Sequence, residues 1–369
     1  KAPRVYNHET NSDELKTTVI DATYQKYYDA AKVPSVKEER SEKFKAIDKE
    51  YIESLAEDTD GETLTMVKRY LGKSKKEAVR NMMLDLKHRL DGRALNEVRQ
   101  IWSEVDFLPS AHGSALFTRG ETQSLTSVTL GSKLDQQMID NAMEKYFSKF
   151  MLHYNFPSFS VGEARPNRGP GRREIGHGNL AERGLKKMLP DDFPYTLRIV
   201  SDILESNGSS SMATVCAGSM AMMDAGIQVK SGLSGIAMGM VADKDGRYAI
   251  LSDILGDEDH LGDMDFKVMG NENGIYACQM DMKVEGLSYD VLEEALLQAK
   301  EGRMHILREM EKTIAKPNEN LKDHAPQIEM MQIPKDKIGA VIGSGGKVIQ
   351  EIQRETGAIV TIEEEGDFG

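Results

Sequence analysis

The sequence contains few cysteines and no long apolar run. Only two cysteines, Cys216 and Cys278, occur among 369 residues. Such a low number disfavours a disulfide framework, and their positions in apolar periodic segments predict two buried, reduced thiols. No apolar stretch approaches the roughly 20 residues that a membrane-spanning helix needs. These absences predict a cytoplasmic protein with no membrane partner.

Positive charge is also in short supply. Lys and Arg number 47 against 60 Asp and Glu, so the formal net charge is −13 at pH 7. A surface of this kind does not hold nucleic acid by bulk positive charge. Any nucleic acid must therefore bind at local basic sites or metal sites. The first residue is Lys1, with no signal-peptide pattern after it, which predicts that the chain begins inside a longer protein.

The length exceeds the usual size of one domain and predicts two or three structural units. Residues 11–72 follow helical periods, and Asn11 and Glu14 have the spacing of a capping box. A charged helix is expected between residues 37 and 60, with a solvated charged face and with Gly61 ending it. This part is predicted to be a small helical unit.

From residue 106 onward the pattern changes to short apolar runs broken by glycine and proline. Helices are expected over 211–225, closed by Gly226, and over 290–314. The clearest strand, 274–285, alternates between a polar face and an apolar face that should pack on helices. Mixed strands and helices predict an α+β domain. Strands are expected over residues 114–117, 125–130, 197–206, 247–255 and 274–285.

A third, small unit is expected at the C-terminal end. The polar run between Pro317 and Pro326 is typical of a linker. Strands are predicted over 328–333 and 359–363, with two helices around a glycine turn within 337–356.

A serine cluster lies where a strand is expected to end. In Ser206-Asn207-Gly208-Ser209-Ser210-Ser211, a glycine turn leads into three hydroxyls at the start of an apolar helix. N–H groups in the first turn of a helix lack helical partners and attract an anion, and serine hydroxyls add neutral donors. The cluster therefore predicts a phosphate-binding turn, against the alternative of an ordinary serine N-cap.

Five carboxylates fall within nine residues directly after an expected strand: Asp257, Glu258, Asp259, Asp263 and Asp265. Like charges this close repel one another, so a structural role is disfavoured unless a cation neutralises them. Oxygen ligands favour Mg²⁺ or Mn²⁺ over Zn²⁺, and the alternating ligands of a calcium loop are missing. We therefore expect a metal site, with an exposed acidic loop as the alternative.

Basic residues accompany the acidic segment. Lys267 lies two residues beyond Asp265, so both side chains point to the same side of a strand. A lysine and a metal together can neutralise charge on a phosphoryl group during its transfer. Arg172 and Arg173, which precede His177, suit phosphate oxygens or an RNA backbone, although alone they are typical of a surface loop.

A Gly-x-x-Gly turn lies between two apolar helical runs near the C-terminal end. In RNA-binding KH modules such a turn lets the backbone approach nucleotide phosphates. Its apolar flanks, from Ile338 to Ile352, make the pattern specific. RNA contact is expected at Gly343, Ser344, Gly345, Gly346 and Lys347.

Taken together and in order, these motifs resemble those of bacterial polynucleotide phosphorylases. The likeness covers nearly the whole chain. In that family a subunit holds two RNase PH-like cores joined by a helical domain, followed by a KH domain and an OB-fold domain. The segments that carry the resemblance are Phe117-Thr118-Arg119-Gly120-Glu121-Thr122-Gln123, Arg172 to Gly178, Ser206 to Met212, Asp253 to Lys267 and the Gly-x-x-Gly turn.

The resemblance implies an α+β fold of ribosomal-protein-like βαβ type, a sandwich of sheet and helices, with helical and KH additions. The expected units are an all-helical domain over 1–76, the second RNase PH-like core over 77–316, a linker over 317–326 and a partial KH domain over 327–369.

The resemblance also implies residue roles and an activity. Asp259 and Asp265 become metal ligands, and Lys267 the neighbouring catalytic cation, while Asp257, Glu258 and Asp263 are left as outer or solvated groups. Inorganic phosphate would attack the terminal 3′ phosphodiester of RNA and release a nucleoside diphosphate, reversibly, with Mg²⁺ or Mn²⁺ as cofactor. Such a polyribonucleotide nucleotidyltransferase is a 3′-to-5′ phosphorolytic exoribonuclease of mRNA degradation. The implied phosphate-binding residues are Ser209, Ser210, Ser211, Arg172, Arg173 and His177.

The implied partners are single-stranded RNA, two further copies in a homotrimer, and RNA-degradation complexes. Three alternatives stay open. A stand-alone RNase PH has a similar core but neither the helical leader nor the KH turn. A catalytically silent RNA-binding ring subunit keeps the fold and loses the acidic pair. An inactive isolated fragment keeps the residues but lacks the first core and the ring.

Overall fold

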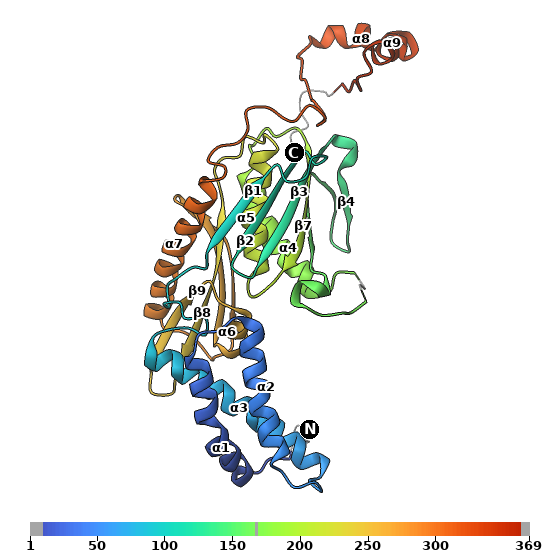
Figure 1. Cartoon of the computed structure of the whole chain (residues 1–369). Helices are drawn as coiled ribbons and strands as arrows, with labels where there is room; N and C mark the ends of the chain where they lie inside the picture. The colour runs from blue at the N-terminus through green and yellow to red at the C-terminus, as the bar shows by residue number, and fades with distance from the viewer. Residues whose placement is uncertain (1–9, 167–168, 363–369) are drawn as a thin grey trace, which may run out of the picture. The chain divides into compact units, whose positions relative to one another are not determined.

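Three helices form the N-terminal part of the computed structural model, which describes residues 10–166 and 169–362. They are α1 (Asp13–Lys32), α2 (Lys37–Glu53) and α3 (Gly61–Leu86), drawn in blue in Figure 1. Ser12, not Asn11, caps α1, because its hydroxyl accepts a hydrogen bond from the Leu15 N–H at 3.2 Å. The predicted capping box is therefore wrong by one residue.

The boundary at Gly61 also differs from the prediction. Gly61 begins α3 instead of ending the preceding helix, because the Asp60 carboxylate accepts hydrogen bonds from the N–H groups of the second and third residues of α3. An acceptor in this position satisfies donors that no helical carbonyl can reach. α3 then runs through residue 76, where we placed the end of the helical domain, to Leu86.

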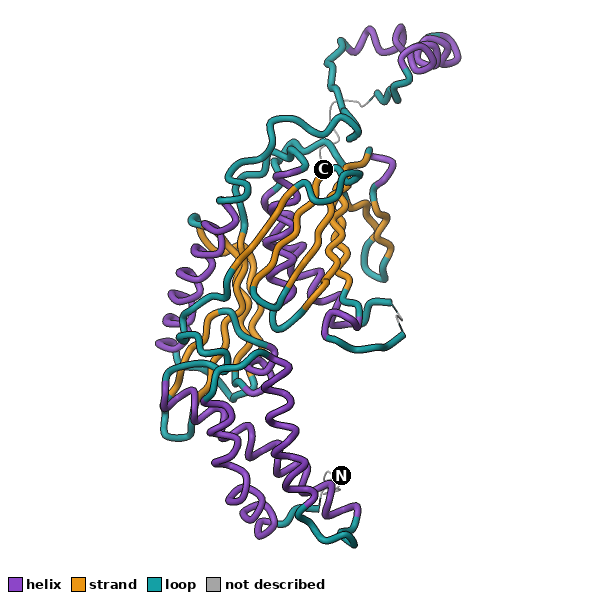
Figure 2. Tube along the Cα trace, viewed as in Figure 1, coloured by secondary structure: helices purple, strands orange, loops and turns teal. Residues whose placement is uncertain are grey.

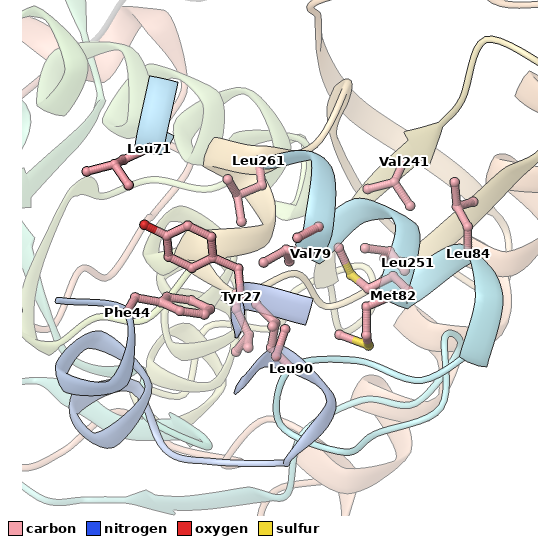
Figure 3. Packing of buried hydrophobic residues seen from close by; sticks show 14 of the residues in the cluster. Tyr27, Phe44, Leu71, Val79, Met82, Leu84, Leu90, Val241, Leu251 and Leu261 are labelled. Carbon is pink, nitrogen blue, oxygen red and sulfur yellow. The ribbon is translucent and has the colours of Figure 1, made fainter. Parts of the chain in front are cut away.

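The three helices share one hydrophobic core with a β-sheet further along the chain. Tyr27 and Met82 belong to this cluster, and so do Val241, Leu251 and Leu261 from the segment that follows residue 230. Figure 3 shows these side chains converging at the junction. The helices are therefore packed onto the core and do not stand apart from it.

The first compact unit, Lys1–Pro326, also contains two larger sheets among its described residues. One has the strand order β1-β2-β3-β7-β6 and the other β11-β10-β8-β9; all neighbours are antiparallel except β6 and β7. A separate ribbon pairs β4 with β5. The predicted strands are confirmed within a few residues at each end. The bounds are β1 (Ile101–Val105), β2 (Gly113–Arg119), β3 (Gln123–Gly131), β4 (Gln137–Asp140), β5 (Lys145–Ser148), β6 (Phe150–Asn155), β7 (Thr196–Glu205), β8 (Ser234–Ala242), β9 (Tyr248–Ser252), β10 (Met264–Asn271) and β11 (Gly274–Met282).

Helices lie between and outside the sheets, as Figure 2 shows. α5 (Ser210–Asp224) is buried along its whole length and packs on β2 and β3 of one sheet and on β8 of the other. α4 (Arg172–Leu185) packs beside it on β6, and α7 (Tyr289–Glu311) covers β8 and β10. The short α6 (Gly256–Leu261) precedes β10. No described helix combines the length and apolarity required to cross a membrane.

The two cysteines lie in different surroundings. Cys216 in α5 is buried, as predicted, whereas Cys278 in β11 is exposed, contrary to the prediction. β11 is the edge strand of its sheet, and α4 covers it only in part. An alternating pattern shows which residues share a face but not whether a neighbouring element covers that face.

The segment predicted as a linker is held against the first unit. The Asn318 N–H donates to the Met223 carbonyl at 3.0 Å, and its side-chain amide donates to the Asp224 carbonyl at 2.8 Å. Gly226, with φ of +77°, faces the carbonyl oxygen of Asn320 so closely that a Cβ would lie 2.5 Å from it. Residues 317–326 are thus a strap on the end of α5.

The second compact unit, Gln327–Gly369, contains the predicted pair of helices. α8 (Ile338–Ile342) and α9 (Lys347–Thr356) flank the glycine turn. The strands predicted over 328–333 and 359–363 do not form over 328–333 and 359–362, and Glu363 lies outside the described residues. A strand requires a neighbour to accept and donate its backbone hydrogen bonds, and these two segments do not pair within the described part of the unit.

Replacing Gly226 by alanine should cost more stability than the same change at Gly246. Both glycines have a left-handed φ, +77° and +85°, so both variants carry a backbone penalty of roughly 1–2 kcal/mol. The methyl group at residue 226 also meets the strap, whereas nothing lies within 4 Å at residue 246, which adds about 1–3 kcal/mol of overpacking at the first site. Chemical denaturation of both variants measures the difference, and equal losses would contradict the packed strap.

Candidate active site

A cavity of about 1560 Å³ lies within the first unit, beside the ends of β6 and β7 and the strand β10. Its walls also include the start of α4, the serine turn and α6. Two of the predicted catalytic and phosphate-binding residues do not line it: Ser211 is buried inside α5, and Arg172 is exposed at the start of α4. The predicted residues that line it are Ser209, Ser210, Arg173, His177, Asp259, Asp265 and Lys267.

The serine turn has a backbone that few residues could adopt. Gly208 has φ of +96°, and a Cβ there would collide with the carbonyl oxygen of Ile254. Ser209 follows with φ of +51°, a left-handed conformation at the N-cap of α5. The first N–H groups of α5 have no helical acceptors. They lie at the N-terminal end of the helix, which borders the cavity.

The three hydroxyls of the turn have different surroundings. Ser210 Oγ lies 2.7 Å from the hydroxyl of Tyr154. The Oγ atoms of Ser209 and Ser211 are buried and have no hydrogen-bond partner among the described residues. Buried polar groups are normally satisfied, so an unpartnered hydroxyl beside a cavity indicates a missing ligand or water. This condition applies to Ser209, which lines the cavity, and not to Ser211.

Two arginines hold the turn from behind through its carbonyl groups. Arg99 Nη1 donates to the Asn207 carbonyl at 2.7 Å, and Arg119 Nη2 donates to the Ser209 carbonyl at 3.1 Å. Both guanidinium groups contact the fully buried carboxylate of Asp253. Burial alone would raise the pKa of Asp253, but Arg119 and Arg99 bring it far below its usual range, so Asp253 is ionised.

Asn207 joins the serine turn to the acidic segment. Its side-chain oxygen accepts a hydrogen bond from the Gly256 N–H at 3.3 Å. Its side-chain amide donates to the Glu121 carboxylate. The phosphate-binding turn predicted from the sequence and the start of α6 are therefore connected by one side chain.

Asp265 and Lys267 lie side by side on β10, as their spacing predicts. The Lys267 ammonium pairs with Asp265 Oδ2, and both side chains are largely buried. Asp265 Oδ1 is also buried but has no hydrogen-bond partner among the described residues. Burial raises the pKa of Asp265, and the attraction of Lys267 opposes that rise. One carboxylate oxygen is therefore available to a cation or to substrate.

Asp259 reaches the same cavity from α6. Its partner is Lys283, which lies just beyond β11 and whose ammonium contacts Asp259 Oδ1 at 3.3 Å and also the Asp259 carbonyl. The sequence interpretation did not assign Lys283 a role. The alternating pattern of residues 274–285 placed Lys283 on the polar face of the predicted strand. It could not show that this face lies against α6.

The donor set fits a hard cation only in part. Within the described residues, no group of three or more His, Cys, Asp and Glu side chains could enclose a metal. Mg²⁺ needs no such enclosure, because it is commonly held by one or two carboxylates together with waters and substrate phosphates. Asp259, Asp265 and the unpartnered Asp265 Oδ1 are compatible with that arrangement.

The other three carboxylates of the acidic segment, which we expect to be outer or solvated groups, are all paired with arginines; the Asp257 side chain is 42% exposed, whereas Glu258 and Asp263 are buried. Glu258 is fully buried in an ion pair with Arg89. The second pair joins Asp263 to Arg80, and the third joins Asp257 to Arg40. The expectation that five carboxylates need a metal overlooked these arginines, which lie 169 to 217 residues away in sequence.

His177 lies at the cavity wall beside Tyr154. Its Nδ1 is 3.4 Å from the Tyr154 hydroxyl, and the two rings meet edge to face with centroids 5.4 Å apart. Burial lowers the pKa of His177 to about 4, and the nearby charges of Lys267 and Arg173 contribute to the shift. The imidazole is therefore neutral at physiological pH and can offer a hydrogen bond but no charge.

Two further residues of the cavity were not found from the sequence. Tyr154 links His177 to Ser210, and Lys37, at the start of α2, brings a positive charge to the cavity from the helical part. Lys37 Nζ lies 3.5 Å from the Ser206 carbonyl. No element was predicted around Tyr154, and Lys37 lies in a charge run that indicates a solvated face.

The glycine turn of the second unit has the backbone its sequence requires. Gly343, Gly345 and Gly346 have φ of +71°, +64° and +79°. A Cβ on Gly343 would lie 2.9 Å from the N atom of Val348 and would also meet its side chain, so this position admits no larger residue without a shift. Gly345 has nothing within 4 Å of its Cβ position, and Ser344 and Lys347 lie in the same turn.

Three family models match separate parts of the chain. The 3′ exoribonuclease family, domain 1, matches residues 97–228, which include the serine turn. A KH domain matches residues 327–368. The RNA binding domain of polyribonucleotide nucleotidyltransferase matches residues 14–94.

Curated relatives align along almost the whole chain. A polyribonucleotide nucleotidyltransferase of Cytophaga hutchinsonii is 63% identical over 370 residues, covering 99% of this chain and 52% of the relative. The corresponding proteins of Bacteroides fragilis and Porphyromonas gingivalis are 59% and 56% identical, with 99% of this chain covered in each case. The chain spans about half the length of these relatives.

The neutral state of His177 can be measured by NMR. In the protein without ligands, we expect its ring C–H signals to titrate with a midpoint of about 4, because burial and two nearby cations oppose protonation. A His177→Gln variant identifies the signals by their loss. A midpoint near 6.5 would contradict the buried, positively charged surroundings described for this imidazole.

Proposed function

The chain belongs to the polyribonucleotide nucleotidyltransferase family, and on that premise we propose that its cavity serves the phosphorolysis of RNA from the 3′ end. Inorganic phosphate attacks the last phosphodiester, a nucleoside diphosphate leaves, and the shortened RNA keeps a 3′ hydroxyl. The reverse reaction extends RNA. The proposal is carried by one observation: the serine turn and the Asp265–Lys267 pair line the same cavity.

In this proposal the serine turn holds the attacking phosphate. The N–H groups of Ser210 and Ser211 begin α5 and lack helical acceptors, and the Ser209 hydroxyl is buried without a partner. Ser211 contributes through its backbone and not through its side chain. Arg173, which also lines the cavity, adds a guanidinium that suits phosphate oxygens, and Arg172 remains outside it.

The other half of the site stabilises the bond that breaks. Asp259 and Asp265 would hold Mg²⁺ or Mn²⁺, which supplies positive charge to phosphoryl oxygens when bound. Lys267 orients Asp265 and places a second positive charge beside it. Neutral His177 and Tyr154 form hydrogen bonds and add no charge. The nucleophile is the phosphate itself, so positioning and electrostatic stabilisation account for most of the catalysis.

We further propose single-stranded RNA as the substrate, bound in part by the turn at Gly343 to Lys347 in the second unit. A homotrimeric ring, association with RNA-degradation complexes and a cytoplasmic location complete the proposal. Two unpaired cysteines support a reducing compartment. A catalytically silent ring subunit is less well supported, because Asp259, Asp265 and Lys267 all line the cavity.

Asp265→Asn in the full-length gene product should lower kcat for phosphorolysis of poly(A) by roughly 100- to 1000-fold, the usual loss when one charge-stabilising group is removed. Asp281→Asn is the matched control: Asp281 pairs with Asp265 across the two strands but is exposed and does not line the cavity. The assay measures nucleoside diphosphates released in the presence of phosphate. Monophosphate products, or turnover without phosphate, would refute phosphorolysis.

Gly345→Asp should weaken RNA binding by about tenfold, because an added carboxylate near a phosphate costs on the order of 1 kcal/mol in water. Gly357→Asp introduces the same group at a glycine with similar φ and open surroundings in the same unit, away from the turn. Filter binding of a long RNA compares the two, and turnover of a short oligonucleotide should be unchanged in both. Equal weakening by both variants would show that the turn has no special role.

A further inference from the structure

We propose that the helical part of the chain is a brace for the active site, and that Arg80 is its main positioning residue. The brace holds the acidic segment, residues 256–267, by binding the three carboxylates that are not proposed as metal ligands: Asp257, Glu258 and Asp263. The effect of the brace on catalysis rests on the proposed roles of Asp259 and Asp265. The contacts between the arginines and the acidic segment are independent of those roles.

Arg80, on α3, binds the turn at residues 261–263, which lies between the two proposed metal ligands Asp259 and Asp265. Its Nη1 donates to Asp263 Oδ1 at 2.7 Å and to the Leu261 carbonyl at 2.9 Å. Its Nη2 donates to Asp263 Oδ2 at 2.6 Å and also to the Ala242 carbonyl. A planar guanidinium can satisfy all four acceptors at once, which a lysine ammonium cannot do.

Arg89 and Arg40 hold the other end of the segment. Arg89 binds both oxygens of Glu258, and it donates to the Asp253 carbonyl at 2.9 Å. Arg40, on α2, contacts Asp257 at 2.7 Å and the Ser35 carbonyl at 2.7 Å. Arg89 lies just after α3. Residues 257 and 258 directly precede Asp259, so Arg40 and Arg89 fix the segment before that proposed ligand and Arg80 fixes the segment after it.

The pinned residue Asp263 is itself connected to the two proposed ligands. Its N–H donates to the Met240 carbonyl at 2.8 Å, which fixes the start of β10 two residues before Asp265. Its carbonyl accepts from the Lys283 N–H at 2.8 Å, and the Lys283 ammonium pairs with Asp259. A shift of Asp263 would therefore move both Asp259 and Asp265.

The burial of these arginines separates bracing from RNA binding. Arg40 is 1% exposed, Arg89 is fully buried and the Arg80 side chain is 16% exposed, and every guanidinium of the set is already bound to a carboxylate. A phosphate of RNA would have to displace these carboxylates, and breaking a buried pair such as that of Arg89 and Glu258 is strongly unfavourable. The three arginines therefore act on the acidic segment and not on nucleic acid directly.

Arg80→Met in the full-length gene product tests the brace with two readouts that do not require turnover. Mn²⁺ affinity, followed by electron paramagnetic resonance of the free ion, should fall about 10- to 100-fold, the usual effect of losing a group that orients metal ligands. Hydrogen exchange should accelerate at the amides of Gly262 and Asp263, which are bonded in the turn that Arg80 holds. Arg80→Lys should recover only part of both losses.

Arg303→Met is the matched control. Arg303 is also buried and binds carbonyl groups of Asn271 and Gly274 at the opposite end of β10. It should lower stability without changing Mn²⁺ affinity or exchange in residues 256–267. Asp263→Asn keeps the side-chain shape and should also weaken Mn²⁺ binding. It replaces Arg80→Met as the test if that variant does not fold.

The outcomes distinguish the brace from the proposed function. Unchanged Mn²⁺ affinity and exchange in Arg80→Met and Asp263→Asn, or equal changes in Arg303→Met, would overturn the brace while leaving phosphorolysis intact. Faster exchange at Gly262 and Asp263 in Arg80→Met would support the brace. If the unsubstituted full-length protein releases no nucleoside diphosphate, the proposed reaction is refuted while the brace stands.

Discussion

The structure depends on one buried carboxylate, that of Asp253. Three guanidinium groups, from Arg93, Arg99 and Arg119, converge on its two oxygens. Each ion alone would be costly to bury, and together they are stable only because the charges and hydrogen bonds are matched. Asp253 also has φ of +50°, an uncommon conformation for a residue with a side chain. Without it, the buried guanidinium groups of Arg99 and Arg119 would lose the carboxylate that both contact, whereas Arg93 would keep its pair with Asp91.

This carboxylate joins parts of the chain that are far apart in sequence. The arginines come from the segment after α3 and from β2, and two of them extend to the carbonyl groups of the serine turn. The nearby pairs of Glu258, Asp263 and Asp257 repeat the principle between α6 and the helical part. The apolar cluster around Tyr27 and Leu261 stabilises the contact between the helices and the core but sets no particular orientation. The ion pairs form only when their partners face each other, so they favour one orientation of the helices on the core.

Much of the fold and part of the candidate site could be predicted from the sequence. Sequence patterns located α5, α7 and the strands β2, β3, β7, β9 and β11 but not β8 or β10, and the two-residue spacing placed Lys267 on the same side as Asp265. Partners distant in sequence could not be found this way. The acidic segment carried no sign that arginines 169 to 217 residues earlier would neutralise three of its members, and Cys278 carried no sign that its strand would form an edge. Local patterns determine which side a residue faces, but tertiary packing determines what it meets.

Asn207 connects the serine turn to Gly256, at the start of the helix that carries Asp259. The two halves of the cavity are thus attached to one framework, and their separation is established when the protein folds. With the RNA substrate that we propose, such a site would contact anionic groups at a set spacing. Successive phosphates of a nucleic acid strand have much the same spacing whatever bases they carry. In that proposal the cavity would be indifferent to base sequence, and any preference among strands would arise from surfaces outside it.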